Sequence, residues 1–400
     1  MITDTSDILI NFATMNHRFL KLMAAAAVIA GTASCGSRSN GDSAGAAGSD
    51  KAGRLLMLIG SYSGADEEGI SLYAFDETDG SSERLGGLYG ISNPSFLAID
   101  PTGKHIYSVG ENGAGNSSIN TIAFNRDSLS LELISTDPVG GAAPCHLALA
   151  SGADGATHVI TANYLGGSAT IYRLGPDGTP AGEPQNIIFS GSGPVADRQE
   201  QSHAHFITFT PDSSRLLVTD LGADRIHVFP LTGNYNLVDT GAMTDVLLAP
   251  GAGPRHIDWH PTLPVGYLID EIDGNINVLG SDSLNILQTI QADTAGAQGS
   301  GDIHVSPDGR YVYSSHRLEA DGIAIFSVDS STGLLTRAGY RPTGRHPRNF
   351  AITPDGRFML VACRDTDTIE VYGIDPSAGG LEKTGRDIAV NKPVCVKFLP

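Results

Sequence analysis

The segment DIHVSPDGRYVYSSHRLEADGIAIFSV, residues 302–328, decides the fold. It contains an alternating apolar and polar run, a PDG turn, a second apolar run, a polar turn and a third apolar run. Alternation over a few residues favours β-strands, and Asp-Gly pairs favour tight hairpin turns. The segment therefore predicts three antiparallel strands joined by short turns.

The same plan recurs along the chain. Segments beginning at Asn93, His203 and His346 repeat it, and APCHLALASGADGATHVITANYLGGSATIYRL and GPRHIDWHPTLPVGYLIDEIDGNINVLG keep the pattern with degenerate turns. The steps between equivalent positions are 50, 60, 50, 49, 44 and 46 residues, counted over Pro94, Pro144, Ala204, Pro254, Ile303, Pro347 and Pro393. Repeats of this length with several strands each are typical of β-propeller blades.

The two ends of the chain complete one further blade. The last repeat, KPVCVKFLP, holds only a first strand, and the missing strands lie in RLLMLIGSYSGADEEGISLYAF, residues 54–75. Pairing the ends closes a ring and removes open sheet edges. Because helical periodicity is nearly absent, we predict an all-β protein, a seven-bladed β-propeller closed by pairing of the N- and C-terminal strands, as a single domain over residues 54–400.

Composition narrows the classes of partner. The chain has 25 Lys and Arg against 44 Asp and Glu, a formal net charge of -19, with 49 glycines and 40% hydrophobic residues. Nucleic acids and anionic lipid surfaces are bound through local positive charge, which this balance disfavours. We expect a small-molecule ligand, no nucleic acid, and a monomer.

The N-terminus is predicted to direct export. The basic stretch NHRFLK after Met15 and the apolar LMAAAAVIAGTAS, too short to span a bilayer, indicate a signal peptide within residues 1–35, with Met15 as an alternative start. TASC resembles a lipoprotein signal-peptidase box, which makes Cys35 the predicted lipidation site; Thr32 stands where leucine is usual, so simple secretion is the alternative. Residues 36–53 predict a flexible tether. We expect a periplasmic, outer-membrane or cell-surface lipoprotein, bound to membrane only through its anchor.

Three cysteines remain in the folded part, Cys145, Cys363 and Cys395. None belongs to a CxxC pair or to a metal-type histidine spacing. Cys145 and Cys395 lie in strand-like segments shortly after a proline, where buried thiols are expected. A disulfide between two of the three is the alternative for an exported chain.

Blade geometry predicts where polar side chains gather. In an antiparallel blade the innermost strand begins on the face of the ring where the second strand ends. The predicted beginnings carry Asn93, His146, His203, His205, Arg255, His256, Asp302, His304 and Arg348. The predicted second-strand ends carry Glu111, Asn163, Tyr164, Asp220, Glu271, His316, Arg317, Arg364 and Asp365. Both sets are therefore expected around one mouth of the central channel.

Imidazoles, guanidiniums and carboxylates at such a mouth favour acid–base chemistry on an anionic ligand. Residues 54–400, the predicted propeller, have no GxSxG motif, which would place a serine nucleophile for covalent catalysis. Water is therefore the expected nucleophile. Opening an ester-like carbonyl needs a base for water and a positive group near the developing oxyanion. We expect no metal site, since no clustered ligand spacing occurs.

Several of these residues also have ordinary structural interpretations. His203 and His205 share a face by alternation, His304 takes the equivalent position of a later blade, and any one of them could cap a turn. Arg348 could be a surface charge. Of Asp270 and Glu271, one must point inward.

The motifs together resemble a known family. GAGPRHIDWHP at 251–261, SHAH at 202–205, GGAAPCH at 140–146, DIHVSPDGRYVYSSHR, PRNFAITPDGR and the terminal PVCVKF are similar to the seven-bladed lactonases, which include bacterial propeller-type 6-phosphogluconolactonases and fungal carboxymuconate cyclases. The resemblance runs from about Leu56 to Phe398. It implies hydrolysis of a sugar δ-lactone without a cofactor.

The resemblance also implies roles for individual residues. His205, with His203 as the alternate, is the expected general base; Arg255 faces the carbonyl oxygen; Glu271 orients Arg255 or the water; and Arg317, with Arg348 as its competitor, holds the anionic end of the substrate. Further expected substrate contacts are His203, His146, Arg348, His304 and Asn163.

Two other functions stay open at this level. The ring could be a non-catalytic, surface-tethered propeller that binds a glycan or a protein, since fold alone does not fix function. It could also be a muconolactone cyclase-like enzyme. Export would separate the protein from the cytoplasm, where 6-phosphogluconolactone is made, and a negative net charge does not attract a phosphate. Whether the lactone is phosphorylated therefore stays open.

Overall fold

The computed structural model describes residues 53–152, 155–232 and 236–400. The predicted signal peptide, the predicted lipidation site Cys35 and all of the predicted tether except Gly53 lie outside the described residues. Within the described part, no helix is long and apolar enough to cross a membrane.

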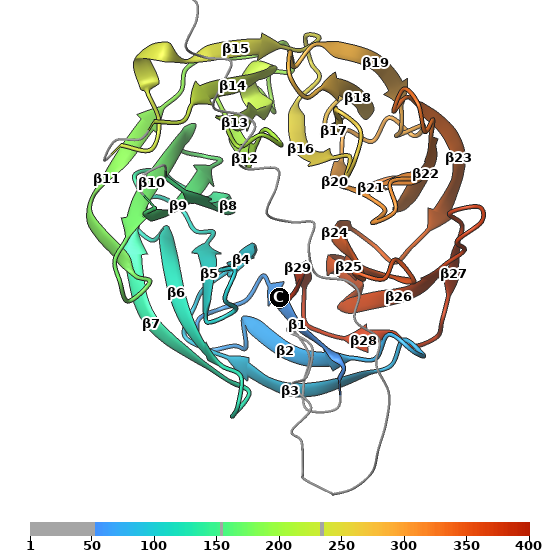
Figure 1. The fold of residues 1–400 in the computed structure, drawn as a ribbon, viewed down its shortest axis with the longest axis horizontal. Helices are drawn as coiled ribbons and strands as arrows, with labels where there is room; N and C mark the ends of the chain where they lie inside the picture. The colour runs from blue at the N-terminus through green and yellow to red at the C-terminus, as the bar shows by residue number, and fades with distance from the viewer. Residues whose placement is uncertain (1–52, 153–154, 233–235) are drawn as a thin grey trace, which may run out of the picture. The chain divides into compact units, whose positions relative to one another are not determined.

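Seven antiparallel sheets follow one another around a ring, which confirms the predicted propeller (Figure 1). Six of them use consecutive strands, and each begins with its innermost strand. From the centre outward these six sheets are β4 (Leu97–Ile99), β5 (His105–Gly110), β6 (Ser118–Asn125) and β7 (Ser130–Pro138); β8 (Pro144–Ser151), β9 (Thr157–Asn163), β10 (Ser168–Leu174) and β11 (Pro180–Ile188); β12 (Ala204–Phe209), β13 (Arg215–Asp220), β14 (Arg225–Pro230) and β15 (Thr244–Leu247); β16 (Pro254–Trp259), β17 (Val265–Asp270), β18 (Asn275–Gly280) and β19 (Ile286–Gln291); β20 (Ser300–Val305), β21 (Tyr311–His316), β22 (Gly322–Val328) and β23 (Leu335–Pro342); and β24 (Pro347–Ile352), β25 (Phe358–Cys363), β26 (Thr368–Ile374) and β27 (Leu381–Lys383), with β28 (Ile388–Ala389) also on β26.

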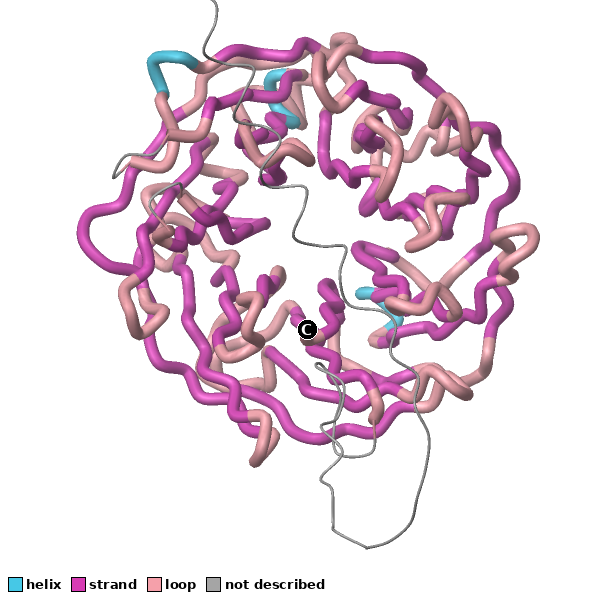
Figure 2. Tube along the Cα trace, viewed as in Figure 1, coloured by secondary structure: helices cyan, strands magenta, loops and turns pink. Residues whose placement is uncertain are grey.

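The seventh blade joins the two ends of the propeller. Its innermost strand is β29 (Pro393–Phe398), followed outward by β1 (Leu55–Ser61), β2 (Ile70–Phe75) and β3 (Ser82–Leu88). Cys395 pairs with Gly60 across the junction, so hydrogen bonds close the ring as predicted. The described helices are short 3₁₀ turns, η1 (Leu221–Ala223), η2 (Thr240–Ala242) and η3 (Arg364–Thr366) (Figure 2).

The hydrophobic core lies between the blades. Each buried cluster combines strands of neighbouring sheets; one, for example, joins Val312 and Phe326 of one blade to Tyr267 and Ile276 of the blade before it. The second strand of each blade is almost entirely buried because sheets cover both of its faces. This packing fixes the inner strands against one another.

The PDG turns lie on one face of the ring. Asp308 accepts a hydrogen bond from the backbone N–H of Arg310, and Gly309 has a φ of +74°, which favours glycine. The innermost strands begin on the other face, opposite the ends of the second strands, as the pairing of Pro254 with Asp270 illustrates. We call this second face the entry face.

Candidate active site at the entry face

A β-bulge near the start of the innermost strand directs side chains toward the centre of the ring. In six blades one additional residue of the inner strand interrupts its pairing with the second strand. Bulges bend a strand and re-aim the side chain of the additional residue. In four of these blades that residue is polar or a thiol: Cys145, His205, Arg255 and Arg348.

The other side chains that line the cavity come from residues that directly follow a second strand. Glu111, Tyr164 and Glu271 occupy this position, one residue after Gly110, Asn163 and Asp270. Together the two sets line a cavity of about 210 Å³, the entry-face cavity, made by Glu111, Cys145, Tyr164, His205, Arg255, Glu271 and Arg348. Of the pair Asp270 and Glu271, Glu271 faces the cavity, and Asp270 turns into its own blade to accept from Asn277.

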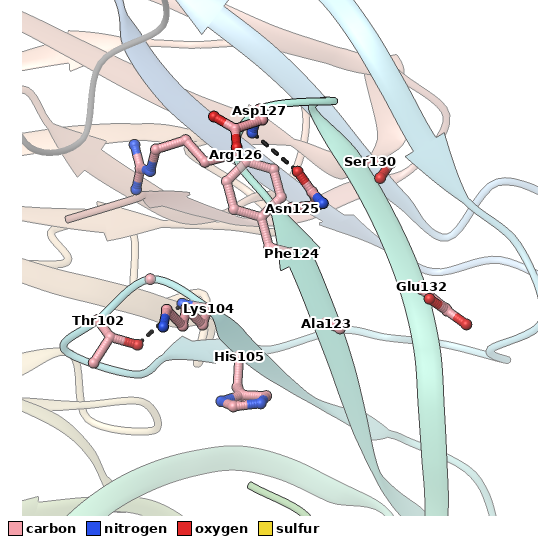
Figure 3. Close-up of a pocket in the computed structure, with 11 residues that line it drawn as sticks. Thr102, Lys104, His105, Ala123, Phe124, Asn125, Arg126, Asp127, Ser130 and Glu132 are labelled. Carbon is pink, nitrogen blue, oxygen red and sulfur yellow. Dashed lines mark hydrogen bonds between the residues drawn. The ribbon is translucent and has the colours of Figure 1, made fainter. Parts of the chain in front are cut away.

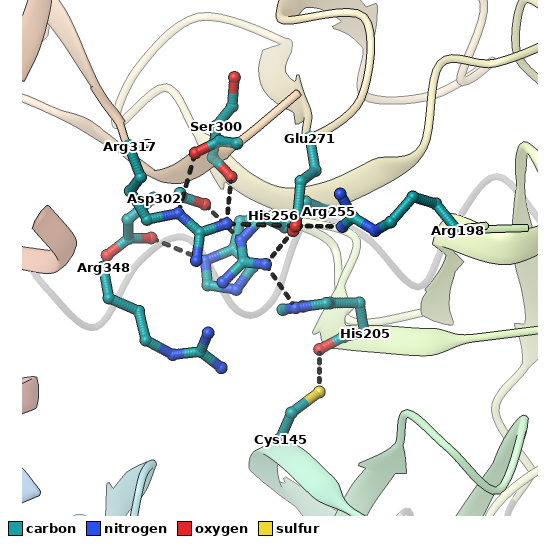
Figure 4. A network of polar contacts seen from close by, with 12 residues as sticks. Cys145, Arg198, His205, Arg255, His256, Glu271, Ser300, Asp302, Arg317 and Arg348 are labelled. Carbon is teal, nitrogen blue, oxygen red and sulfur yellow. Dashed lines mark hydrogen bonds and ion pairs between the residues drawn. The ribbon is translucent and has the colours of Figure 1, made fainter. Parts of the chain in front are cut away.

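Glu271 is the centre of a buried network of arginines (Figure 4). Its Oε2 is paired with Nη1 of Arg255, and its Oε1 lies 2.5 Å from Nη2 of Arg198 and 3.2 Å from Nη2 of Arg317. Burial alone would raise the pKa of Glu271, but Arg255, Arg317 and Arg198 outweigh burial and lower it. Glu271 is therefore a fixed negative charge that holds three guanidinium groups.

Arg255 is held on three sides. Its Nε donates to the backbone oxygen of Gly301 at 2.6 Å, and its Nη1 contacts both Glu271 and Nε2 of His205, the latter at 2.7 Å. Thr219 donates to its backbone oxygen. Its Nη2 makes no hydrogen bond to any residue that the structure describes, so this end of the guanidinium is the part available to a ligand.

The contact with Arg255 defines the protonation state of His205. A guanidinium only donates, so Nε2 of His205 accepts and the ring proton lies on Nδ1. Burial, followed by the charge of Arg255, lowers the pKa of His205 well below its ordinary value. His205 is thus a neutral imidazole whose basic lone pair is already occupied, which does not suit the predicted role of general base.

A second cluster stands on the opposite side of the cavity. Oε2 of Glu111 accepts from the hydroxyl of Tyr62 at 2.8 Å and from Oγ of Ser95, and it lies 3.7 Å from Nη2 of Arg348. The guanidinium of Arg348 also lies over the Tyr62 ring, 5.3 Å from its centre. Of Arg317 and Arg348, the two arginines predicted as alternatives for binding the anionic end of the substrate, Arg348 lines the cavity.

Arg317 is committed to the framework. Its Nε donates to the oxygen of Gly299 at 2.8 Å, its Nη2 donates to the oxygen of Ser300 at 3.0 Å, and its Nη1 contacts His346. These contacts, with its ion pair to Glu271, leave it behind the cavity wall. Arg317 therefore supports Glu271 more directly than it could hold a ligand.

His146 lies beneath the cavity in an aromatic floor. Its ring packs between Phe96 and Phe206 at centroid distances of 4.2 and 4.1 Å, and its Nδ1 accepts from the backbone N–H of Ile207. His256 continues this floor, with its ring 4.6 Å from that of Phe206. His146 does not line the entry-face cavity, so its predicted substrate contact stays a prediction.

His304 does not occupy the position predicted for it. The register pairs Ser300 with His316 as it pairs Ala204 with Asp220, so Ser300, and not Ile303, is the equivalent residue of this blade. His304 therefore lies deeper than His205 and outside the entry-face cavity, with Nε2 3.0 Å from Asp302. The repeat was misaligned by three residues because the degenerate start of this strand, Ser300–Gly301, has no proline.

Removal of the His304 side chain is expected to affect stability in a pH-dependent way. Burial opposes the charged imidazole, but Asp302 and Asp258 outweigh burial and raise its pKa from 6.5 to about 10. The stabilisation is therefore complete below about pH 6.5 and lost as pH rises through about 10. We expect His304→Gln to lower the free energy of unfolding by about 1–2 kcal/mol at neutral pH. Urea unfolding at pH 6 and pH 10 measures this; an equal loss at both would contradict it.

His203 and Asn163 are satisfied away from the cavity. The two ring nitrogens of His203 contact the backbone oxygen of Tyr164 and the carboxylate of Glu200, at 2.9 and 3.2 Å. The amide of Asn163 donates to two hydroxyls inside its own blade, those of Ser168 and Thr170. Neither residue lines the entry-face cavity, so the predicted substrate contacts of both are absent from its wall.

Cys145 lines the cavity as a neutral thiol. Its Sγ lies 3.3 Å from the backbone oxygen of His205, and burial raises the pKa of the thiol. Cys145, Cys363 and Cys395 are all free and buried, so the alternative of a disulfide between them is wrong for the described cysteines. A buried, neutral thiol does not favour covalent catalysis.

Two residues of the site, Arg198 and Tyr62, were not predicted from the sequence, and a third, Glu111, was predicted without a role. Arg198 comes from the loop between β11 and β12, which has no counterpart in the repeat. Tyr62 follows β1 as Glu271 follows β17, so the blade register could have found it. Glu111 was placed at a strand end but received no role.

The charge of the site is opposite to that of the chain. Arg198, Arg255, Arg317 and Arg348 surround two carboxylates, Glu111 and Glu271. Among the described residues no three His, Cys, Asp or Glu side chains are grouped as ligands for a metal ion. The arrangement is suited to an anionic ligand with an electrophilic carbonyl.

Two larger cavities lie among the hairpin turns of the other face. One, of about 590 Å³, is lined by Lys104, His105, Phe124, Arg126 and their neighbours (Figure 3). The other, of about 680 Å³, is formed around Pro307, Tyr311 and Phe358. Neither brings together a guanidinium, an imidazole and a carboxylate in mutual contact, as the entry-face cavity does.

The chain is thus a seven-bladed propeller with a polar cavity where its inner strands begin. Residues 56–398 match the family model described as Lactonase, 7-bladed beta-propeller, and the chain belongs to this family. The resemblance inferred from the motifs is thereby confirmed.

Individual relatives cover nearly the whole propeller. A 6-phosphogluconolactonase of Formosa agariphila is 32% identical over 344 residues, 84% of this chain and 97% of the relative. A Bacteroides fragilis protein of known structure is 41% identical, with a TM-score of 0.82 over 87% of this chain and 98% of its own. The periplasmic gluconolactonase PpgL of Pseudomonas aeruginosa is 30% identical, with a TM-score of 0.78 over 86% of this chain and 99% of its own.

Proposed function

We propose that the protein is a lactonase that hydrolyses a sugar lactone, in the manner of the 6-phosphogluconolactonases to which it is similar. Support comes from the family, from the names of relatives that align along the whole propeller, and from the entry-face cavity. The observation that carries the proposal is the open end of Arg255, a preorganised donor in the wall of the entry-face cavity.

In the proposed reaction, water attacks the lactone carbonyl. Nη2 of Arg255 receives the carbonyl oxygen as negative charge develops on it, and His205 and Glu271 hold Arg255 in place. Arg348 binds the anionic part of the substrate, while Arg317 and Arg198 fix Glu271. No step requires a cofactor.

The charge of the cavity favours a negatively charged sugar lactone. Arg255 and Arg348 balance Glu111 and Glu271 in the cavity wall, and Arg198 and Arg317, which do not line it, add positive charge around the site. Guanidinium groups bind phosphate and carboxylate well. A pH-stat assay of acid release, corrected for spontaneous hydrolysis, should use gluconolactone, its 6-phosphate, galactonolactone and a muconolactone. We expect the highest kcat/KM with the phosphorylated sugar lactone. Preference for the muconolactone would favour the cyclase-like alternative, and binding without turnover of any of the four would favour a non-catalytic propeller.

We further propose that the protein is exported and anchored through a lipid on Cys35. The signal-like residues 15–35 and the periplasmic relative from Pseudomonas aeruginosa support export. Mass spectrometry of the mature N-terminus tests the anchor: a diacylated Cys35 supports it, and an unmodified N-terminus beyond Cys35 contradicts it.

A further inference from the structure

The proposed hydrolysis needs a group that takes the proton from water, and the residues first expected to do so are occupied. Nε2 of His205 accepts from Arg255, and both oxygens of Glu271 are paired with arginines. Cys145 is a buried neutral thiol. Burial also raises the pKa of the Tyr62 hydroxyl, which donates to Glu111.

Glu111 is the remaining carboxylate in the wall of the cavity. The hydrogen bonds to its carboxylate reach one oxygen: Oε2 accepts from Tyr62 and Ser95, and it also lies near Arg348. Oε1 makes no hydrogen bond with any described residue. The carboxylate is therefore fixed in orientation by one oxygen, and the other has a free lone pair.

Such an arrangement suits a general base, which must be positioned and yet keep one acceptor available for water. Tyr62 follows the second strand β1 of the seventh blade, and Ser95 precedes the inner strand β4 of the neighbouring blade, so two blades fix the same oxygen. Arg348 places its guanidinium 3.7 Å from this same oxygen, Oε2. Arg255, the donor proposed for the carbonyl oxygen, lines the same cavity.

We propose that Glu111 is the catalytic general base of the lactonase reaction, an inference that rests on the proposed function. Its Oε1 takes a proton from water while the water oxygen bonds to the carbonyl carbon and the π electrons move to the carbonyl oxygen beside Arg255. The oxyanion then re-forms the C=O bond and the ring C–O bond breaks. The proton held by Glu111 passes to the departing alkoxide oxygen, giving the open hydroxy acid, which loses its acid proton to solvent.

The test compares the full-length protein with Glu111→Gln, which keeps size and an acceptor for Tyr62 but cannot take a proton. We expect kcat to fall by about 10²- to 10⁴-fold with little change in KM. Tyr62→Phe and Ser95→Ala remove only hydrogen bonds that position Glu111, so kcat should fall by less in these two variants. Circular dichroism and the thermal midpoint identify any variant that has lost the fold.

Chemical rescue separates a base from a structural carboxylate. In Glu111→Ala, added formate should restore part of kcat in proportion to its concentration, whereas chloride at equal ionic strength should not. A folded Glu111→Gln protein with parental kcat, or an inactive Glu111→Ala protein that formate does not rescue, would overturn the assignment. If the parent itself opens none of the lactones, the proposed function fails instead, so the two failures are distinguishable.

Discussion

Arg255→Ala is expected to lower kcat/KM for lactone opening by about 10²- to 10³-fold, the loss typical of removing one donor to an oxyanion. In the folded protein Arg255 is the guanidinium with an open Nη2 in the entry-face cavity, and three contacts preorganise it. The loss should lie mainly in kcat, because the carbonyl oxygen carries more negative charge in the transition state than in the bound substrate. Steady-state kinetics in the pH-stat measure it directly.

The matched control for this variant is Arg310→Ala. Arg310 is exposed on the opposite face, where it pairs with the neighbouring Asp308 and lies over the ring of Tyr311. Its removal should leave both kcat and KM unchanged. Parental kinetics in a folded Arg255→Ala protein would show that the carbonyl is not activated at this position.

Glu271→Ala is expected to be the most destabilising single change at the site, by about 3–5 kcal/mol at neutral pH, because it leaves buried guanidiniums without their counter-charge. Arg255, Arg198 and Arg317 all contact this one carboxylate. Activity should fall as well, since Arg255 would lose one of its supports. Chemical denaturation of the parent and variant measures the difference in the free energy of unfolding.

The pH dependence of this difference has a definite sign. The pKa of Glu271 is lowered in the folded state from its ordinary value of 4.5, so its stabilising contribution is present above about pH 4.5. The contribution is lost as pH falls below that value toward the lower folded-state pKa. Glu271→Gln, which keeps the shape but not the charge, should lose most of the same stability. If either variant were as stable as the parent at pH 7, Glu271 would not be the centre of the network.

The fold could be predicted because its determinants are local and repeated. The alternation around PDG turns marks individual hairpins, and the incomplete repeat at Pro393 matches the unpaired strands at residues 54–75. The rule that an inner strand begins where a second strand ends then brought Arg255 and Glu271 to one face, although they are separated along the chain. These inferences need only strand direction and order.

The details of the site depend on features that the alternation does not encode. The β-bulge determines which of two successive side chains faces the cavity. His205 lines the cavity, whereas Phe206 packs against His146 in the aromatic floor beneath it. Arg198 reaches Glu271 from a loop outside the repeat. The contact that occupies the lone pair of His205 depends on side-chain distances of a few ångströms, which spacing cannot predict.

The most direct test of the central claim is the crystal structure of the full-length protein with a lactam analogue of gluconolactone 6-phosphate, which resembles the substrate but resists opening. We expect the analogue in the entry-face cavity, with its carbonyl oxygen hydrogen-bonded to Arg255 and its phosphate near Arg348. We also expect a water molecule between the carbonyl carbon and Oε1 of Glu111. An analogue bound among the hairpin turns of the opposite face, with the entry-face cavity left to solvent at saturating ligand, would contradict it.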